Sequence, residues 1–199
     1  MLTIGITGSS GSGKGYVCDI LRENGIPCLD TDRVCHDLYK AGTECSEALA
    51  REFGAEILTP DGIDRKKLGA IVFSAEDKLA RLNEIAHFYI RKETVDWLGN
   101  EEKNGTRVAV IDAPLLFESG FDALCDIKVT VTADRETQIS RITERDGISA
   151  EAAEARLSNQ KPTFFYVEKS DYVIDNSASV GDGVKTETKK LADMLLKMA

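Results

Sequence analysis

A glycine-rich segment near the N-terminus, GSSGSGK at residues 8–14, constrains the fold of this chain more than any other feature. It follows an apolar run at residues 2–7 that is typical of a buried strand. It precedes a helical pattern with apolar Val17, Ile20 and Leu21 on one face. A strand, a glycine loop, a lysine and a helix, in that order, form the context in which such a loop cradles phosphate. The alternative is a Ser/Gly-rich turn with a chance lysine, and the flanking elements favour phosphate binding.

The residue types in this loop fit the chemistry of phosphate binding. Backbone N–H groups of the loop and the positive end of the following helix converge on phosphate oxygens. Gly8, Gly11 and Gly13 allow the backbone angles that this cradle needs, and Lys14 brings a positive charge to the outer phosphates. A Ser or Thr usually comes next, because its hydroxyl reaches Mg²⁺, but this chain has Gly15 there. We therefore expect nucleotide binding beside an altered metal site.

Length and charge limit the organisation and the partners. The 199 residues suit one α/β domain with a lid or a small inserted subdomain. The net charge of −9, from 34 acidic and 25 basic residues, argues against a nucleic-acid partner bound through a broad basic surface. No apolar run approaches membrane-spanning length, and the chain enters a strand directly, without a charged leader. We therefore expect no membrane association.

The cysteines indicate the redox compartment. There are five of them, an odd number, and no C-x-x-C pair occurs. This argues against a disulfide framework or a zinc site and favours a reduced, cytoplasmic protein. A metal cluster of Cys35, His36 and Cys45 is the alternative to ordinary buried thiols and an exposed histidine, and the second interpretation is preferred.

Five short apolar runs predict the strands of one sheet: residues 2–7, 26–29, 108–111, 127–132 and 172–174. Most are continuous Val/Ile-rich stretches, which is typical of parallel strands covered on both faces. Helical patterns separate them, and this implies βαβ crossovers. The expected fold is an α/β, doubly wound, five-stranded parallel sheet with flanking helices.

Two helical segments are predicted beside this sheet within a single domain of residues 1–199. The segment 41–98 carries three helical patterns and is too long for one crossover. The segment 135–160 is a second helical excursion, broken at Gly147, and it contains Arg135, Arg141, Arg145 and Arg156. A mobile helical lid with several arginines suits a kinase, and an arginine-bearing surface helix is the equally weighted alternative.

An ordered series of short motifs runs from Gly8 to Asn176: GSSGSGK at 8–14, LDTD at 29–32, FG at 53–54, DGIDR at 61–65, H-x-x-I-R at 87–91, DAPLLFE at 112–118, RDGISAEAAEARLSNQ at 145–160 and VIDN at 173–176. In this series the chain resembles the dephospho-CoA kinases. These are P-loop enzymes that phosphorylate the ribose 3′-hydroxyl of dephospho-CoA in the last step of coenzyme A synthesis. The resemblance implies a nucleoside-monophosphate-kinase-like P-loop fold, with a substrate-binding insertion at about 41–98 and a lid at about 135–160. It also implies ATP and Mg²⁺ as cofactors and small-molecule substrates.

The resemblance assigns roles to the two aspartates that follow the second predicted strand. Asp32 matches the carboxylate that would accept the proton of the substrate hydroxyl, and Asp30 lies with it at the expected acceptor site. Such a group orients the attacking oxygen, while the loose transition state needs charge stabilisation more than strong base chemistry. Without the resemblance, Asp30 or Thr31 could simply cap the next helix, and an aspartate in a first turn is common.

The expected acceptor site contains five further residues. The resemblance places His87 and Arg91 near the acceptor, and their spacing of one helical turn puts them on one face. Arg65 binds substrate or pairs with Asp61 or Asp64. Asp112 holds a Mg²⁺-bound water or fixes its loop. Leu116 belongs to the core or to a wall of the substrate cleft.

The donor site and the lid complete the expected set. Arg141 and Arg145 are four residues apart, and the resemblance implies that one or both reach the transferring phosphate when the lid closes. Asn176, after the last strand, matches a position near the adenine of ATP, and a turn-forming asparagine is the alternative. The rest of the expected ATP site lies in the glycine loop and the start of its helix: Gly8, Gly11, Ser12, Gly13, Lys14, Gly15 and Tyr16.

Three residues depart from the family's pattern. Gly15 lacks the metal-binding hydroxyl, and Tyr16 stands where the family favours a small Ser or Thr. A water can replace one missing Mg²⁺ ligand, so we expect an active kinase with a higher Mg²⁺ requirement. Phe88 stands where the family usually has a proline after the histidine, so the helix there can run straight through.

Two other functions compete with phosphorylation of dephospho-CoA. One is a P-loop kinase for another small acceptor, which the DAPLLFE motif disfavours. The other is a nucleotide-binding regulatory protein that Gly15 has deprived of catalysis, which the persistence of Asp32, Asp112 and the lid arginines disfavours. The chain is expected to act as a monomer or a small homo-oligomer.

Overall fold

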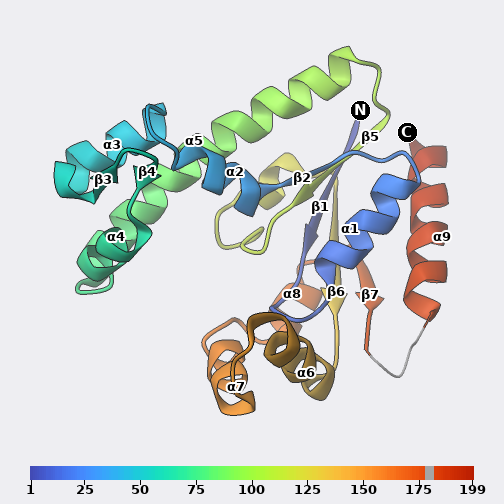
Figure 1. Cartoon of the computed structure of the whole chain (residues 1–199). Helices are drawn as coiled ribbons and strands as arrows, with labels where there is room; N and C mark the ends of the chain where they lie inside the picture. Colours follow the sequence, from blue (N-terminus) through green and yellow to red (C-terminus); the bar gives the residue numbers. More distant parts are fainter. Residues whose placement is uncertain (178–181) are drawn as a thin grey trace. The chain divides into compact units, whose positions relative to one another are not determined.

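The computed structural model describes residues 1–177 and 182–199. It divides into two compact units, one formed by residues 1–29 and 100–199 and the other by residues 30–99. The first unit is built on a five-stranded parallel sheet with the strand order β2-β5-β1-β6-β7 (Figure 1). The predicted fold class is confirmed.

The strands lie close to the five predicted apolar runs: β1 (Leu2–Thr7), β2 (Cys28–Asp30), β5 (Val108–Asp112), β6 (Ile127–Thr132) and β7 (Tyr172–Asp175). Ile4 of β1 pairs in parallel with Val110 of β5 on one side and with Ile127 of β6 on the other. All five residues of β5 are buried, and only the first residue of β1 is not fully buried. Burial on both faces explains why these strands are continuous apolar runs without alternation.

The helices of the first unit are α1 (Lys14–Glu23), α6 (Arg135–Asp146), α7 (Ala150–Ser158), α8 (Thr163–Val167) and α9 (Gly183–Met198), with a 3₁₀ turn η2 (Phe121–Leu124). Helices α1 and α9 lie side by side (Figure 1). Val17, Leu21, Leu191 and Leu195 from these two helices belong to the same core cluster as the strands. Helix α6 begins at the cap Asp134 and ends at Gly147, where the sequence predicts a break.

The second unit contains α2 (Thr31–Leu38), α3 (Glu44–Phe53), η1 (Ala55–Ile57), α4 (Arg65–Val72) and most of α5 (Glu76–Lys103). Its own core includes Cys45, Leu49, Ile57, Leu68 and Ile85. A short antiparallel hairpin, β3 (Leu58–Thr59) and β4 (Gly62–Ile63), joins η1 to α4. In the part of the chain that the structure describes, no helix has the length and apolarity needed to cross a membrane.

Candidate functional site

The glycine loop joins β1 to α1, and its backbone is in close contact with the elements behind it. Gly11 and Gly13 have φ values of +76° and +84°, which residues with a side chain rarely adopt. A Cβ atom at Gly11 would lie 2.7 Å from the backbone oxygen of Gln138 on α6, and one at Gly13 would overlap the Asn176 amide nitrogen. These two positions therefore require glycine for both backbone angle and space.

Arg141 and Asn176 hold the loop by its carbonyl groups. The Arg141 guanidinium donates to the carbonyl oxygens of Gly11 at 3.2 Å and Ser12 at 3.3 Å. The Asn176 side-chain amide donates to the same Ser12 oxygen at 2.8 Å, and its own oxygen accepts a hydrogen bond from Arg141 at 3.5 Å. Because these donors occupy the carbonyl side, they fix the conformation of the loop.

Two glutamines from the lid segment also contact the loop. Gln138 Nε2 donates to the Ser9 hydroxyl at 2.6 Å, and Gln160 Oε1 accepts from the Ser10 backbone N–H at 3.0 Å. Neither residue belongs to the predicted site. Gln160 does end the RDGISAEAAEARLSNQ motif, but nothing in the motif alone indicates which atom it contacts.

Lys14 and Asp112 form an ion pair at the carboxyl edge of the sheet. Lys14 is the first residue of α1, and Asp112 is the last residue of β5. Their side chains are 15% and 6% exposed, so both charges lie mostly out of water. A largely buried ammonium at the mouth of a phosphate loop has strong attraction for an anion, because screening by solvent is weak there.

Gly15 and Tyr16 continue the first turn of α1. Among the described residues, no atom outside the local helix lies within 4 Å of a Cβ built on Gly15, so a serine fits there. The Tyr16 side chain is 47% exposed. Ser12 has a buried hydroxyl for which the described residues supply no hydrogen-bond partner. The loop therefore combines a buried hydroxyl at Ser12 with open space at position 15.

The described residues contain no cluster of three or more His, Cys, Asp or Glu side chains that could hold a metal by themselves. All five cysteines are free, with Cys45 buried and Cys35 half-buried. Magnesium accepts few protein ligands and keeps several waters, so the single carboxylate of Asp112 is a suitable donor.

The other lid arginines contact acidic residues of α6 and α7. Arg145 forms two hydrogen bonds with Asp146, at 2.7 and 2.9 Å, and Arg156 pairs with the same carboxylate. These guanidinium groups hold the pKa of Asp146 well below its ordinary range. Arg135 pairs with Glu154 at 2.6 Å. Of the four lid arginines, Arg141 is therefore the one hydrogen-bonded to the glycine loop.

In the second unit, Asp30 and Asp32 lie where β2 gives way to α2. The Asp30 carboxylate accepts from the backbone N–H groups of Asp32 at 2.9 Å and Arg33 at 3.2 Å, so it caps α2. The capping alternative for Asp30 is thus observed. Asp32 occupies the first turn of α2 and is exposed.

Arg65, His87 and Arg91 are the other predicted acceptor residues in this unit. Arg65 hydrogen-bonds His36 Nδ1 at 2.8 Å, and its guanidinium lies 5.4 Å from the centre of the Tyr39 ring. His87 is half-buried, and this burial lowers its pKa. Arg91 is exposed. Helix α5 continues through position 88, as expected without a proline.

Leu116, the last predicted acceptor residue, is fully buried in the first unit, in the loop after β5. It lies against Gly5, where a Cβ would meet its side chain at 2.8 Å. The neighbouring Glu118 accepts a hydrogen bond from the Tyr166 hydroxyl at 3.2 Å. The DAPLLFE segment is therefore anchored in the core of the sheet.

A five-stranded parallel sheet with flanking helices and a glycine loop before its first helix is the P-loop kinase fold. A shikimate kinase from Bacteroides thetaiotaomicron has this fold, with a TM-score of 0.56 over 98% of each chain at 12% identity. A structure from Thermus thermophilus is closer, with a TM-score of 0.80 at 30% identity over 96% of this chain and 97% of that one.

Comparison with known sequences identifies the family. The family model described as dephospho-CoA kinase matches residues 2–182. A dephospho-CoA kinase from Lactobacillus johnsonii is 36% identical over 96% of each chain, and one from Arabidopsis thaliana is 39% identical over 92% of this chain and 79% of that protein. The chain belongs to the dephospho-CoA kinase family. It is an enzyme that uses ATP to phosphorylate dephospho-CoA in coenzyme A biosynthesis.

Proposed function

We propose that the phosphates of ATP bind on residues 8–16 and that Lys14 exchanges its partner in the process. The observation that carries this proposal is the mostly buried Lys14–Asp112 ion pair at the mouth of the loop. ATP brings phosphate oxygens that replace the Asp112 carboxylate as the partner of the ammonium. Asp112 is then released to accept hydrogen bonds from other groups near the phosphates. Arg141 and Asn176 keep the loop amides aligned during this exchange.

Asp32 is the residue we assign to the attacking hydroxyl. It is an exposed carboxylate in the first turn of α2, two residues after the end of β2, and ligands of open α/β sheets gather where strands end. It accepts a hydrogen bond from the ribose 3′-hydroxyl, orients its oxygen towards the γ-phosphorus, and takes the proton as the new O–P bond forms. ADP leaves with the electrons of the broken bond.

Magnesium fits this site through oxygen donors. Asp112 would hold it through a water, and water would stand where Gly15 supplies no hydroxyl. When bound, the metal neutralises charge on the phosphates. The chain's own contribution is the ammonium of Lys14 and the loop amides, which act without it.

The remaining acceptor and lid residues keep their predicted roles in this proposal. Arg91 and Arg65 supply positive charge for the diphosphate of dephospho-CoA, and His87 a neutral ring beside it. Leu116 is fully buried, so it supports the loop after β5 from the core and does not line the acceptor site. Arg145 reaches the transferring phosphate only by leaving Asp146. We also propose a cytoplasmic location, because free cysteines suit a reducing compartment.

The test is acceptor-dependent release of ADP, with the product identified by mass. Asp32→Asn keeps the shape of the side chain and removes the proton acceptor, so we expect kcat to fall by about 100-fold or more with little change in KM. Asp37→Asn, an exposed aspartate on the same helix, is the matched control and is expected to behave as wild type. Full turnover by Asp32→Asn would show that another group receives the proton.

A further inference from the structure

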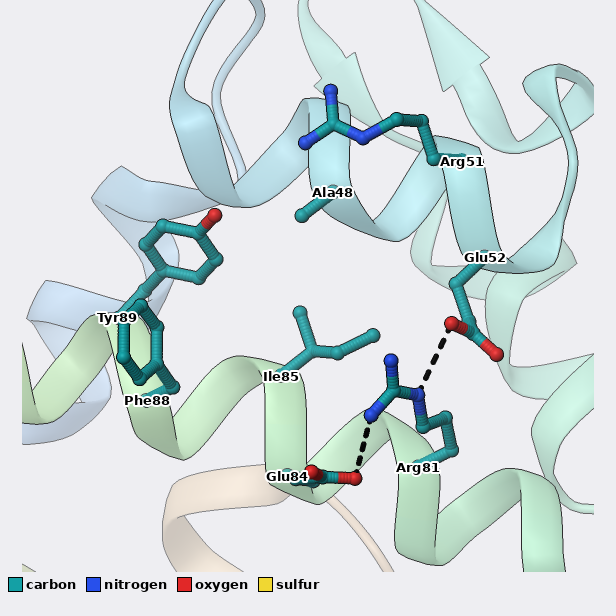
Figure 2. A pocket seen from close by; sticks show the side chains of 8 residues that line it. All are labelled: Ala48, Arg51, Glu52, Arg81, Glu84, Ile85, Phe88 and Tyr89. Carbon is teal, nitrogen blue, oxygen red and sulfur yellow. Dashed lines mark hydrogen bonds and ion pairs between the residues drawn. The ribbon is translucent and has the colours of Figure 1, made fainter.

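The second unit contains a cavity between α3 and α5 that the phosphoryl-transfer roles do not use. Its volume is about 390 Å³, within the range of roughly 300–1,000 Å³ typical of small-molecule sites. Eight side chains line it (Figure 2): Ala48, Arg51, Glu52, Arg81, Glu84, Ile85, Phe88 and Tyr89. It is therefore large enough for a flexible arm of a substrate.

The charges around this cavity balance one another. Arg81 is held between two carboxylates, with Glu52 at 3.0 Å and Glu84 at 2.6 Å, as the dashed lines in Figure 2 mark. Arg51 has its own acidic neighbour, Glu47, at 3.8 Å. No excess positive charge remains for a phosphate group. The cavity therefore favours a neutral ligand that has hydrogen-bonding groups.

The opposite end of the cavity is aromatic and aliphatic. Phe88 and Tyr89 form an edge-to-face pair with ring centres 5.1 Å apart, and Ile85 and Ala48 lie between this pair and the charged end (Figure 2). Phe88 is 64% exposed, so its ring is accessible to a ligand. One ligand would thus meet an apolar wall at one end and guanidinium and carboxylate groups at the other.

We propose that this cavity binds the pantetheine arm of dephospho-CoA. This assignment depends on the role in acceptor binding proposed above for the second unit. The arm is neutral, and it carries a dimethyl-substituted carbon, a hydroxyl and two amide groups. The apolar carbons pack on Phe88 and Ile85. The amide oxygens accept from Arg51 or Arg81, and the amide N–H groups donate to Glu52 or Glu84.

The position of Phe88 on α5 supports this assignment. Glu84 and Ile85 each lie three or four residues from both Arg81 and Phe88, so the four side chains share one stripe of the helix. His87 and Arg91 form the adjacent stripe, where the charged part of the acceptor is expected. The acceptor would therefore place its diphosphate on one stripe and its arm on the next. Phe88 is also the position at which this chain departs from the family's usual proline.

The experiment compares two acceptors that differ only in the arm: dephospho-CoA and the methyl ester of adenosine 5′-diphosphate, whose ribose hydroxyls are the same. For Phe88→Ala we expect KM and Kd for dephospho-CoA to rise about tenfold, with both constants for the methyl ester unchanged. Ala48→Phe, which fills the cavity, should have the same selective effect. Phe73→Ala, which changes another exposed phenylalanine of this unit outside the cavity, is the control.

Equal changes for both acceptors, or no change for either, would overturn the proposal. A second copy of the chain covering the cavity would instead reveal itself by a lower molar mass of Phe88→Ala in sedimentation, without acceptor selectivity. Calorimetric Kd values for dephospho-CoA and the methyl ester report binding without turnover, so they separate a failure of the arm site from a failure of the phosphoryl-transfer roles. If the wild type turned over neither acceptor, those roles would be contradicted. The two Kd values would still decide whether the arm binds in this cavity.

Discussion

Replacing Asn176 by alanine tests whether this residue acts on the phosphate loop or on the adenine of ATP. The side chain is 5% exposed, and its amide donates to the Ser12 carbonyl at 2.8 Å. Alanine removes that donor and the oxygen that accepts from Arg141. Arg141 still donates to the Ser12 carbonyl at 3.3 Å, so this carbonyl keeps a partner and the hydrogen bond that is lost costs about 0.5–1.5 kcal/mol. In a chain of this size each 1 kcal/mol lowers Tm by about 2–4 °C, so we expect a fall of roughly 1–6 °C without any nucleotide.

The same change should weaken nucleotide binding without regard to the base. The loop amides lose part of their alignment, so ATP, GTP and inorganic triphosphate should all bind less tightly by a similar factor, about tenfold for each 1.4 kcal/mol. The measurements are calorimetric titrations with the three ligands and thermal unfolding of the free protein. Asn159→Ala, an exposed asparagine at the end of α7, serves as the control for both.

One result would refute this reasoning. If Asn176→Ala weakened ATP alone, with triphosphate affinity and Tm unchanged, the residue would act by contacting adenine, as the family resemblance implies. The hydrogen bond to Ser12 would then contribute little to the conformation of the loop.

Two further predictions concern the metal site and the lid. Gly15→Ser should lower the Mg²⁺ concentration needed for half-maximal activity, because the new hydroxyl has open space beside it. Gly99→Ser, at an equally open position, is the control and should leave this concentration unchanged. An unchanged Mg²⁺ dependence of Gly15→Ser would show that position 15 does not limit metal binding. Asp146→Asn should destabilise the protein at neutral pH, because Arg145 and Arg156 lower the pKa of this carboxyl. As the pH falls below the ordinary pKa of 3.8, the carboxyl of the unfolded state is protonated before that of the folded state. The difference in unfolding free energy between wild type and Asp146→Asn, measured in urea, should therefore close there. A difference that persists at lower pH would contradict an ionic origin.

The strands of this protein could be predicted from the sequence because they are buried on both faces. A strand in that environment must be apolar throughout, and the runs at 2–7 and 127–132 coincide with β1 and β6. The hairpin of β3 and β4 could not be predicted in this way. Its strands have two residues each, and their pairing depends on contacts that a periodicity does not record.

In the candidate site, too, features set by neighbouring residues could be predicted from the sequence, and contacts between distant residues could not. The phosphate loop is a continuous motif, so its residue types were sufficient to predict it. The Lys14–Asp112 pair joins residues 98 positions apart, and no local pattern links them. Equal spacing on one helix face suggested similar roles for Arg141 and Arg145, yet their neighbours differ, because one meets loop carbonyls and the other meets Asp146.

The shape of the glycine loop is thus determined by the donors that hold its carbonyl groups and by close packing at its glycines. Gly11 and Gly13 are the positions where the backbone of α6 and the side chain of Asn176 approach most closely. A larger residue at either position would displace these supports before any nucleotide arrived. A loop held in this way has its N–H groups oriented in advance, so binding costs less ordering, and the same amides can stabilise charge that develops during transfer. Helix α6 and the end of β7 therefore support the loop from behind, although each lies more than 120 residues from it in the sequence.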